Sequence, residues 1–378
     1  MTWIAWKMLT GNQGKYLGII LGIAFASLLI AQQSSIFCGL MRLTISQIKD
    51  LEGADIWVMD PNVQFIDDIK PLSENDLYRV RGVPGVEWAV RLYKGLTRAR
   101  MADGNFQQII LLGLDDATMV GAPREMVAGS LADLRRPDAL IMDEAGYKQL
   151  WPNEPFELGK TFEMNDHRAV LVGICKARHT FQTFPIVYTR YTQAVGFVPA
   201  ERKVLSFILA EPEPGLGSPE VCRRIAEQTG LLAMPRADFS TKTIWYFLQK
   251  TGIPINFGIT VLLGFIVGTA IAGQTFYLFT IENLKQFGAL KAMGAGNLRL
   301  MGMILFQALV VGAIGYGLGI GGAALFGHVT RNASKLAFFM PWQVLVGTGV
   351  AVLLIAVLSC LISMRKVLVL EPAVVFQG

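Results

Sequence analysis

The sequence has little charge. Asp, Glu, Lys and Arg make up 17% of its 378 residues, whereas soluble domains carry about 25%. The shortage is confined to residues 1–41 and 251–378, which together hold 11 of the 63 charged side chains. The other 52 lie in residues 42–250, at the density of a soluble domain. This distribution excludes an ordinary soluble enzyme and predicts a water-soluble domain inserted into a membrane domain.

Sequence motifs for nucleotide and metal chemistry are absent. No GxxxxGK[ST] segment is present to wrap a phosphate, because Gly14-Lys15 lacks both the upstream glycine and the following Ser or Thr. The three histidines are far apart and none belongs to an HExxH motif: His167, His179 and His328. We therefore expect no metal and no cofactor in this chain, and no catalytic residue.

The acidic pairs Asp115-Asp116 and Asp143-Glu144 are interpreted as solvated loop carboxylates, because adjacent side chains point in different directions and form poor acid–base pairs. The apolar runs have no ionisable residue at their centres, so a relay for ion-coupled transport has no candidate. The net charge of +5 combines +7 in the apolar stretches with −2 in the central domain. Nothing indicates binding to nucleic acid, which would require a basic face on the soluble part.

The four cysteines show no metal-ligand spacing. Cys38 and Cys360 lie in apolar segments, and Cys175 and Cys222 lie in the central domain. The sequence leaves open whether the central pair forms a disulfide or remains as two thiols.

Four segments have the roughly 20 apolar residues that a membrane-spanning helix needs. The predicted organisation is an interfacial segment at 1–15, spans at 16–41, 251–280, 301–326 and 342–364, a soluble domain at 42–250, loops at 281–300 and 327–341, and a tail at 365–378. A cleavable signal peptide over residues 1–31 is the alternative for the first segment, favoured by Lys7, Lys15 and Ala24-Phe25-Ala26. Continuation of the apolar run to Leu40 favours a span.

Basic residues at the ends of the spans predict the orientation, because they accumulate on the cytoplasmic side. One side carries Lys7, Lys15, Lys285, Lys291, Arg299, Arg365 and Lys366, and the other carries Arg331 and Lys335. We therefore expect cytoplasmic termini, a cytoplasmic 281–300 loop and a central domain outside the cytoplasm.

The central domain is predicted to be mixed α/β. Short β-rich runs, ADIWVMD, QQIILLGL, RAVLVGIC and LSFILAE, alternate with turn signals and with helical stretches such as SPEVCRRIAEQTG. The stretches 41–51 and 239–249 keep helical periodicity next to spans one and two. They predict a helical stalk with a kink at Pro254.

Glycines spaced four apart in the spans predict close helix packing, either within the chain or in a dimer. They are Gly18, Gly22, Gly264, Gly268, Gly315 and Gly319. The loop after span two is predicted to contain a short helix and a Gly294-Ala295-Gly296 turn. It could dock a soluble partner or serve only as a positively charged topogenic loop. Phe287, Leu290 and Met293 recur at spacings of three, which predicts one apolar helix face.

This loop, LKQFGALKAMGA at 284–295, resembles the EIG.LRA.GA element that follows the second span in permeases of the MacB, FtsX and LolC/LolE type. The layout is also similar: one span, a large periplasmic domain, three more spans and a tail motif, here Leu370–Phe376. Three segments look closest to DevC-like permeases of DevBCA-type exporters: the sequence of this loop, GIAFASLL at 22–29 and the LEPAVVF ending.

The resemblance implies a mechanotransmission ABC permease without its own ATPase, so that ATP and Mg are bound by a separate ATP-binding subunit. Its coupling positions would be Gln286, Phe287, Gly288, Leu290, Lys291, Ala292, Met293, Gly294 and Ala295. Gln286 stands where the family often has Glu.

The resemblance further implies a bacterial inner-membrane protein that forms a homodimer or pseudo-dimer. It would work with a periplasmic adaptor (membrane fusion) protein and a TolC-like outer-membrane duct, on a lipid, glycolipid or amphiphile. The alternatives are an FtsX-like signalling protein that activates a periplasmic partner without transport, and a membrane-anchored periplasmic enzyme.

Overall fold

The computed structural model describes residues 2–11, 13–199, 204–333 and 336–368. The chain divides into two compact units. The membrane unit combines Met1–Leu40 with Gly252–Gly378, and the sheet unit is Met41–Thr251. The predicted tail motif Leu370–Phe376 and the predicted flanking charge Lys335 lie outside the described residues.

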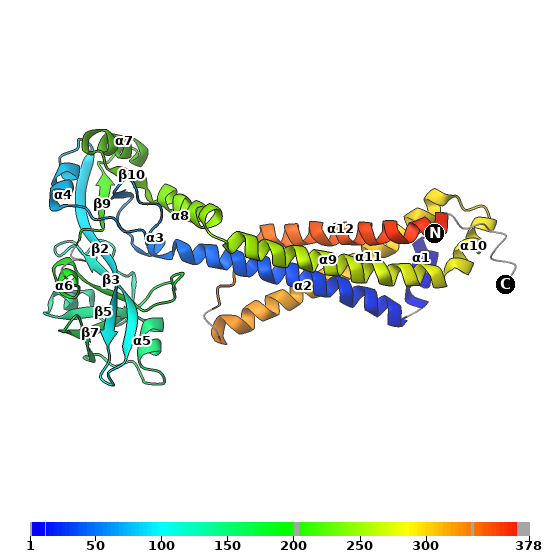
Figure 1. The fold of residues 1–378 in the computed structure, drawn as a ribbon, viewed down its shortest axis with the longest axis horizontal. Coiled ribbons are helices and arrows are strands. Elements are labelled where there is room, and N and C mark those ends of the chain that lie inside the picture. Colours follow the sequence, from blue (N-terminus) through cyan, green and yellow to red (C-terminus); the bar gives the residue numbers. More distant parts are fainter. Residues whose placement is uncertain (1, 12, 200–203, 334–335, 369–378) are drawn as a thin grey trace. The chain divides into compact units, whose positions relative to one another are not determined.

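The membrane unit is helical. Its described helices are α1 (Thr2–Gly11), α2 (Gln13–Thr44), α9 (Ile253–Glu282), α10 (Leu284–Ala292), α11 (Asn297–Ala333) and α12 (Trp342–Leu368), shown in Figure 1. Four segments in the described part of the chain are long and apolar enough to cross a membrane: Tyr16–Thr44, Ile253–Glu282, Asn297–Thr330 and Trp342–Leu361. A helix satisfies its own backbone hydrogen bonds, which hydrocarbon cannot do. The prediction of four apolar spanning helices is confirmed.

Small residues set the distances between these helices. A methyl group added to Gly268 of α9 would lie 2.3 Å from Cβ of Ala26 in α2, and one added to Gly319 of α11 would lie 2.6 Å from the Ala24 carbonyl oxygen. All six glycines singled out in the sequence have side chains of another helix of this chain within 4 Å of such a methyl group. These glycines therefore pack against other helices of the same chain.

The sheet unit is built on one ten-stranded mixed sheet with the order β10-β1-β9-β2-β3-β8-β5-β7-β4, and β6 beside β2 and β7. The strands are β1 (Ile56–Met59), β2 (Val86–Arg100), β3 (Phe106–Leu114), β4 (Glu125–Gly129), β5 (Ala139–Asp143), β6 (Thr161–Met164), β7 (His167–Lys176), β8 (Ile186–Arg190), β9 (Phe207–Pro212) and β10 (Leu232–Pro235). The pairs β3·β8 and β5·β7 are parallel, and the other pairs are antiparallel. The predicted mixed α/β class is confirmed, and each β-rich run noted above contains a strand.

The continuous apolar runs arise because the sheet is covered on both faces. Successive side chains of a strand point to opposite faces. In β3, Ile109 and Leu111 enter one buried cluster, whereas Ile110 and Leu112 enter the other.

Different helices cover the two faces. The first cluster includes residues of α4 (Glu74–Arg81), α5 (Glu144–Leu150), α6 (Tyr191–Gly196) and α7 (Ser218–Thr229). The second includes residues of α3 (Ser46–Asp50), the 3-10 helix η1 (Leu131–Arg135) and α8 (Arg236–Lys250). The helices that begin and end the sheet unit, α3 and α8, therefore pack on the same face.

The stretch predicted to be helical over 41–51 is helical in two pieces, because α2 ends at Thr44 and α3 runs over Ser46–Asp50. One predicted feature of the connecting helices is wrong. Pro254 does not kink a helix. It lies in the first turn of α9, where its missing N–H has no intrahelical partner to lose. The preceding helix α8 ends at Lys250, and Thr251 is extended.

Candidate coupling site

The predicted coupling segment forms helix α10, which follows α9 with one residue between them. Asn283 is both the C-cap of α9 and the N-cap of α10, and its side-chain Nδ2 donates to the Phe279 carbonyl at 2.8 Å. The Phe287 amide donates to the Asn283 carbonyl at 3.0 Å. These bonds hold the start of α10 on the end of the spanning helix.

The end of α10 is a Schellman motif centred on Gly294, which has φ +92°. The Ala295 amide donates to the Leu290 carbonyl, and the Gly294 amide donates to the Lys291 carbonyl, both at 3.0 Å. The left-handed conformation favours glycine because a Cβ there is strained. The expected glycine turn thus becomes a defined helix stop before α11.

The inner side of α10 packs into the membrane unit. Phe287 is 0% exposed, and Leu290 and Ala295 are also buried. They share one apolar cluster with Ile19 and Ile23 of α2, Phe276 and Phe279 of α9, and Met303 and Ile304 of α11. Burial of Phe287 is a large part of what fixes α10 to the spans, since deleting a buried Phe side chain costs about 3–5 kcal/mol.

The outer side presents different residues. Met293 is 76% exposed and Leu298, in the first turn of α11, is 82% exposed. Lys285, Gln286 and Ala292 are also exposed.

The prediction that Phe287, Leu290 and Met293 share one apolar helix face is therefore wrong. Phe287 and Leu290 share a face, but it is turned inward. Met293 is the C-cap, where the helix ends and its direction no longer follows the helical repeat.

A groove of about 660 Å³ runs between α1 and the α9–α10 junction. It is lined by Trp3, Ile4, Lys7, Met8 and Gly11 on one side and by Glu282, Asn283, Gln286, Ala289, Leu290 and Met293 on the other. Its lining combines charged, polar and apolar side chains.

Helix α1 packs against the other helices of the membrane unit through buried residues. Ala5 and Leu9 are fully buried, and the Gln307 side chain of α11, itself fully buried, donates to the Ala5 carbonyl at 2.7 Å. The exposed Trp3 and Trp6 fit the interfacial segment predicted for this region. No pattern in the sequence indicates that this segment forms one wall of a groove beside α10. Only the pairing of the Gln307 amide with α1 reveals it.

The interpretation of the acidic pairs as solvated loop carboxylates is wrong for Asp115 and Asp143, which are buried and have structural roles. The Asp143 carboxylate caps α5 by accepting from the Gly146 amide at 3.0 Å and also accepts from the Ile186 amide at 2.7 Å. Burial raises the pKa of the Asp143 carboxyl. Asp115 accepts from the Thr118 hydroxyl and amide in a local turn.

The thiols Cys175 and Cys222 are both buried and free, and they lie in different core clusters. Within the residues that the structure describes, no group of three His, Cys, Asp or Glu side chains could hold a metal ion.

Known proteins resemble both units. The MacB-like periplasmic core domain matches residues 16–228, and the FtsX-like permease C-terminal domain matches residues 243–372. Uncharacterised ABC transporter permeases from two strains of Mycobacterium tuberculosis are each 25% identical over 355 residues, covering 89% of this chain and 88% of their own.

Two solved structures show a likeness to part of the chain. The periplasmic region of MacB from Actinobacillus actinomycetemcomitans is 14% identical, with a TM-score of 0.38, over 51% of this chain and 94% of that one. The extracellular domain of the noncanonic ABC-type transporter YknZ from Gram-positive bacteria is 16% identical, with a TM-score of 0.36, over 48% of this chain and 98% of that one. The MacB-like match alone covers more than half of the sequence, and the chain belongs to the MacB/FtsX-type ABC transporter permeases.

Proposed function

We propose that this permease transmits the movement of a separate ATP-binding subunit to its own sheet unit, as part of an ATP-driven exporter. A permease of this family implies an ATP-binding partner. Because the sequence has no phosphate-binding loop, ATP and Mg are assigned to that partner. The observation that carries the proposal is the two-sidedness of α10, with Phe287 buried on one side and Met293 exposed on the other.

The exposed side is the proposed docking surface. Met293 and Leu298 supply apolar side chains that a groove on the partner can bury, and Trp3 extends this surface onto α1. Apolar and aromatic anchors of this kind dominate the energetics of protein interfaces. Exposed Lys285 is a rim charge, which typically contributes about 0–1 kcal/mol.

The buried side is the proposed transmission element. Protein interiors are close-packed and have low compressibility, so a push on α10 is passed through Phe287 to its cluster partners in α2, α9 and α11. Helix α2 is continuous from Gln13 to Thr44 and is followed by α3, whose Ile48 belongs to the sheet core. Because the sheet unit begins at Met41, within α2, movement of α2 along its axis would reach the start of that unit.

We infer the location and partners of the permease from its family and from the distribution of basic residues at the ends of its spans. We infer a bacterial inner-membrane location with cytoplasmic termini and a cytoplasmic α10, because basic residues are concentrated at these ends of the spans. The sheet unit would then lie in the periplasm and meet an adaptor protein and a TolC-like duct. Two copies of the chain would pair, as a dimeric ATPase requires two docking surfaces. The substrate would be a lipid, glycolipid or amphiphile.

Copurification of the ATP-binding subunit with the full-length chain tests this function. Met293→Asp should reduce the copurified ATPase at least about tenfold, because it places a charge in an apolar contact. The stability of the permease should change by no more than about 0.5 kcal/mol, as expected at an exposed site. Lys285→Ala is the control and should retain the ATPase. Normal ATPase recovery and ATP hydrolysis with Met293→Asp would reject α10 as the coupling surface.

A further inference from the structure

A polar pocket lies inside the sheet unit, where α3 contacts α8. Its volume is about 560 Å³, and its lining is Ile45, Lys49, Glu52, Arg178, Arg236, Ala237, Ser240, Thr241 and Ile244. Three of these side chains are basic and one is acidic, so the lining carries a net positive charge.

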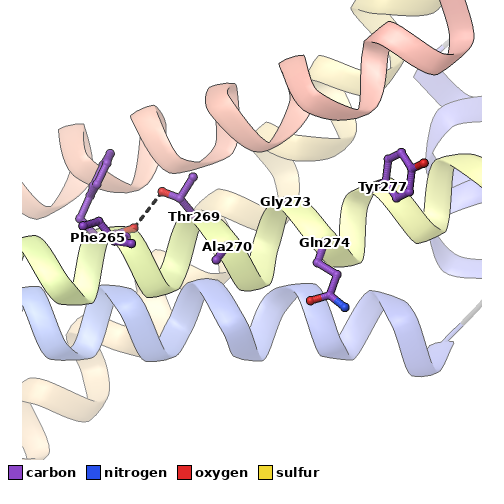
Figure 2. A pocket seen from close by; sticks show the side chains of 7 residues that line it. Phe265, Thr269, Ala270, Gly273, Gln274 and Tyr277 are labelled. Carbon is purple, nitrogen blue, oxygen red and sulfur yellow. Dashed lines mark hydrogen bonds between the residues drawn. The ribbon is translucent and has the colours of Figure 1, made fainter.

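The groove on α9 of the membrane unit, drawn in Figure 2, has a different lining. It consists of Phe265, Ile266, Thr269, Ala270, Gly273, Gln274 and Tyr277, none of which is charged. The Thr269 hydroxyl donates to the Phe265 carbonyl of its own helix at 2.8 Å, shown as a dashed line. Of these two hollows, the pocket in the sheet unit is the one whose lining can recognise a charged ligand.

Two of the charged side chains in the pocket already have partners. Arg178 pairs with Asp50 of α3 at 3.4 Å, and the Arg178 amide donates to the same carboxylate at 2.8 Å. Glu52 pairs with Arg124, which lies outside the lining. The acidic member of the lining is therefore neutralised by a residue from elsewhere.

The other two basic side chains, Lys49 and Arg236, form no ion pair with any residue that the structure describes. Lys49 is exposed and Arg236 is half-buried. The Glu211 carboxylate lies near Arg236, but it accepts from the Asp55 amide at 2.9 Å and is absent from the lining. A guanidinium presents a fork of donors that matches phosphate oxygens, and an ammonium adds a point charge.

The hydroxyl groups of the pocket do not supply donors to a ligand. Ser240 donates to the Arg236 carbonyl at 2.9 Å, and Thr241 donates to the Ala237 carbonyl at 3.0 Å. The groups that can hold an anion here are therefore the basic side chains.

The lining changes from apolar to basic along both helices. On the first, Ile45 precedes α3 and Lys49 follows one turn later. On the second, Arg236 begins α8 and Ile244 lies eight residues later, about 12 Å along the axis. Ile45 directly follows the apolar segment Tyr16–Thr44, and α8 leads into α9. Along the chain, the apolar lining residues are thus nearer to the spans than the basic ones.

We infer that this pocket binds the phosphate group of an anionic amphiphile, with Lys49 and Arg236 on the phosphate and Ile244 beside the first part of the acyl chain. A ligand with a charged head and an apolar tail matches the polarity of the lining at both ends. The inference rests on the proposed export of an amphiphile and specifies the chemistry of its head group.

Calorimetric titration of the full-length chain in a neutral detergent tests the ligand class, with dioctanoyl phosphatidic acid as the probe. Dioctanoylglycerol has the same chains without the phosphate, and should bind at least about tenfold more weakly, because it makes no charge-assisted hydrogen bond. Glycerol 3-phosphate has the phosphate without the chains. It should also bind at least about tenfold more weakly, since two buried methylene groups contribute that much.

Substitutions locate the site. Arg236→Gln should raise the dissociation constant for phosphatidic acid about tenfold, and Lys49→Gln, at an exposed position, about threefold. The matched control is Lys250→Gln, an exposed lysine of the same helix α8 that is outside the lining. It should leave the affinity unchanged. Lys49→Gln should keep the thermal midpoint of the unaltered chain, so its result does not depend on the folding of Arg236→Gln.

Three results would overturn the inference. Equal affinities for phosphatidic acid and dioctanoylglycerol would remove the anion site, and equal affinities for phosphatidic acid and glycerol 3-phosphate would remove the amphiphile. An effect of Lys250→Gln as large as that of Lys49→Gln would assign the binding to general surface charge.

The complex with the ATP-binding subunit separates this inference from the proposed function. Phosphatidic acid should stimulate ATP hydrolysis by the unaltered complex, and the stimulation should require a higher concentration in Lys49→Gln. Retention of the ATP-binding subunit without binding of phosphatidic acid would reject only the pocket. Loss of the ATP-binding subunit from the unaltered chain would reject the proposed function itself.

Discussion

The two units of this permease both have apolar interiors, but they are held together by different means. In the sheet unit, large side chains fill the core: the Trp57 and Phe207 rings lie 5.4 Å apart, and Phe207 and Phe239 lie 6.1 Å apart. In the membrane unit, Gly268 and Gly319 let helix backbones approach closely. Removal from water drives the first kind of packing. Lipid provides no such force between helices, so close contact must replace it.

The largest effect should come from the aromatic core of the sheet unit. Phe207→Ala removes a fully buried ring between Trp57 and Phe239 and should lower the free energy of unfolding of this unit by about 3–5 kcal/mol. Urea unfolding of the full-length chain in detergent, followed by protease resistance of the sheet unit, measures it. The control Phe106→Ala, at a ring that is mostly exposed, should be nearly silent. Equal effects of the two variants would contradict the assigned core.

A smaller effect is expected at Gly268, where two spans are too close together to admit an added methyl group. Gly268→Ala would place its Cβ 2.3 Å from that of Ala26 and should destabilise the membrane unit by about 1–3 kcal/mol. Gly258→Ala on the same helix has open space around it and is the matched control. The thermal inactivation midpoint of the chain in detergent should fall for Gly268→Ala only. A stable Gly268→Ala variant would show that the membrane unit does not depend on close contact.

The smallest of these effects concerns the helix stop after α10. Gly294→Ala meets no steric clash but forces a residue with a Cβ into φ +92°, at a cost of about 1–2 kcal/mol. Gly296→Ala, two residues later, is also free of clashes and should change stability little. Hydrogen exchange of the α10 amides should accelerate in Gly294→Ala relative to Gly296→Ala. Equal exchange rates in the two variants would show that the Schellman motif does not stabilise the end of α10.

Composition was enough to predict the apolar helices and the mixed α/β domain, because a long apolar run or a β-rich run carries its own structural signal. The inward turn of Phe287 was missed, since helical spacing shows which residues share a face but not which way that face points. Only the cluster around Phe276 and Ile304 settles its direction. Pro254 was misplaced because a proline is equally compatible with a kink and with a first turn.

The groove beside α10 could not be predicted from local sequence. It depends on the hydrogen bond between Gln307 and the Ala5 carbonyl, which joins residues 302 positions apart.

Site-specific cross-linking to the ATP-binding subunit tests whether α10 docks that subunit with its exposed side and the spans with its buried side. Cysteines placed at Met293 and at Phe287 lie six residues apart, but on the exposed and buried sides of the same segment. With a short thiol cross-linker in native membranes, Met293→Cys should join the permease to the ATP-binding subunit, and Phe287→Cys should give no more product than the unaltered chain. Cross-linking through position 287 without cross-linking through position 293 would contradict the assignment of the exposed side of α10 as the docking surface.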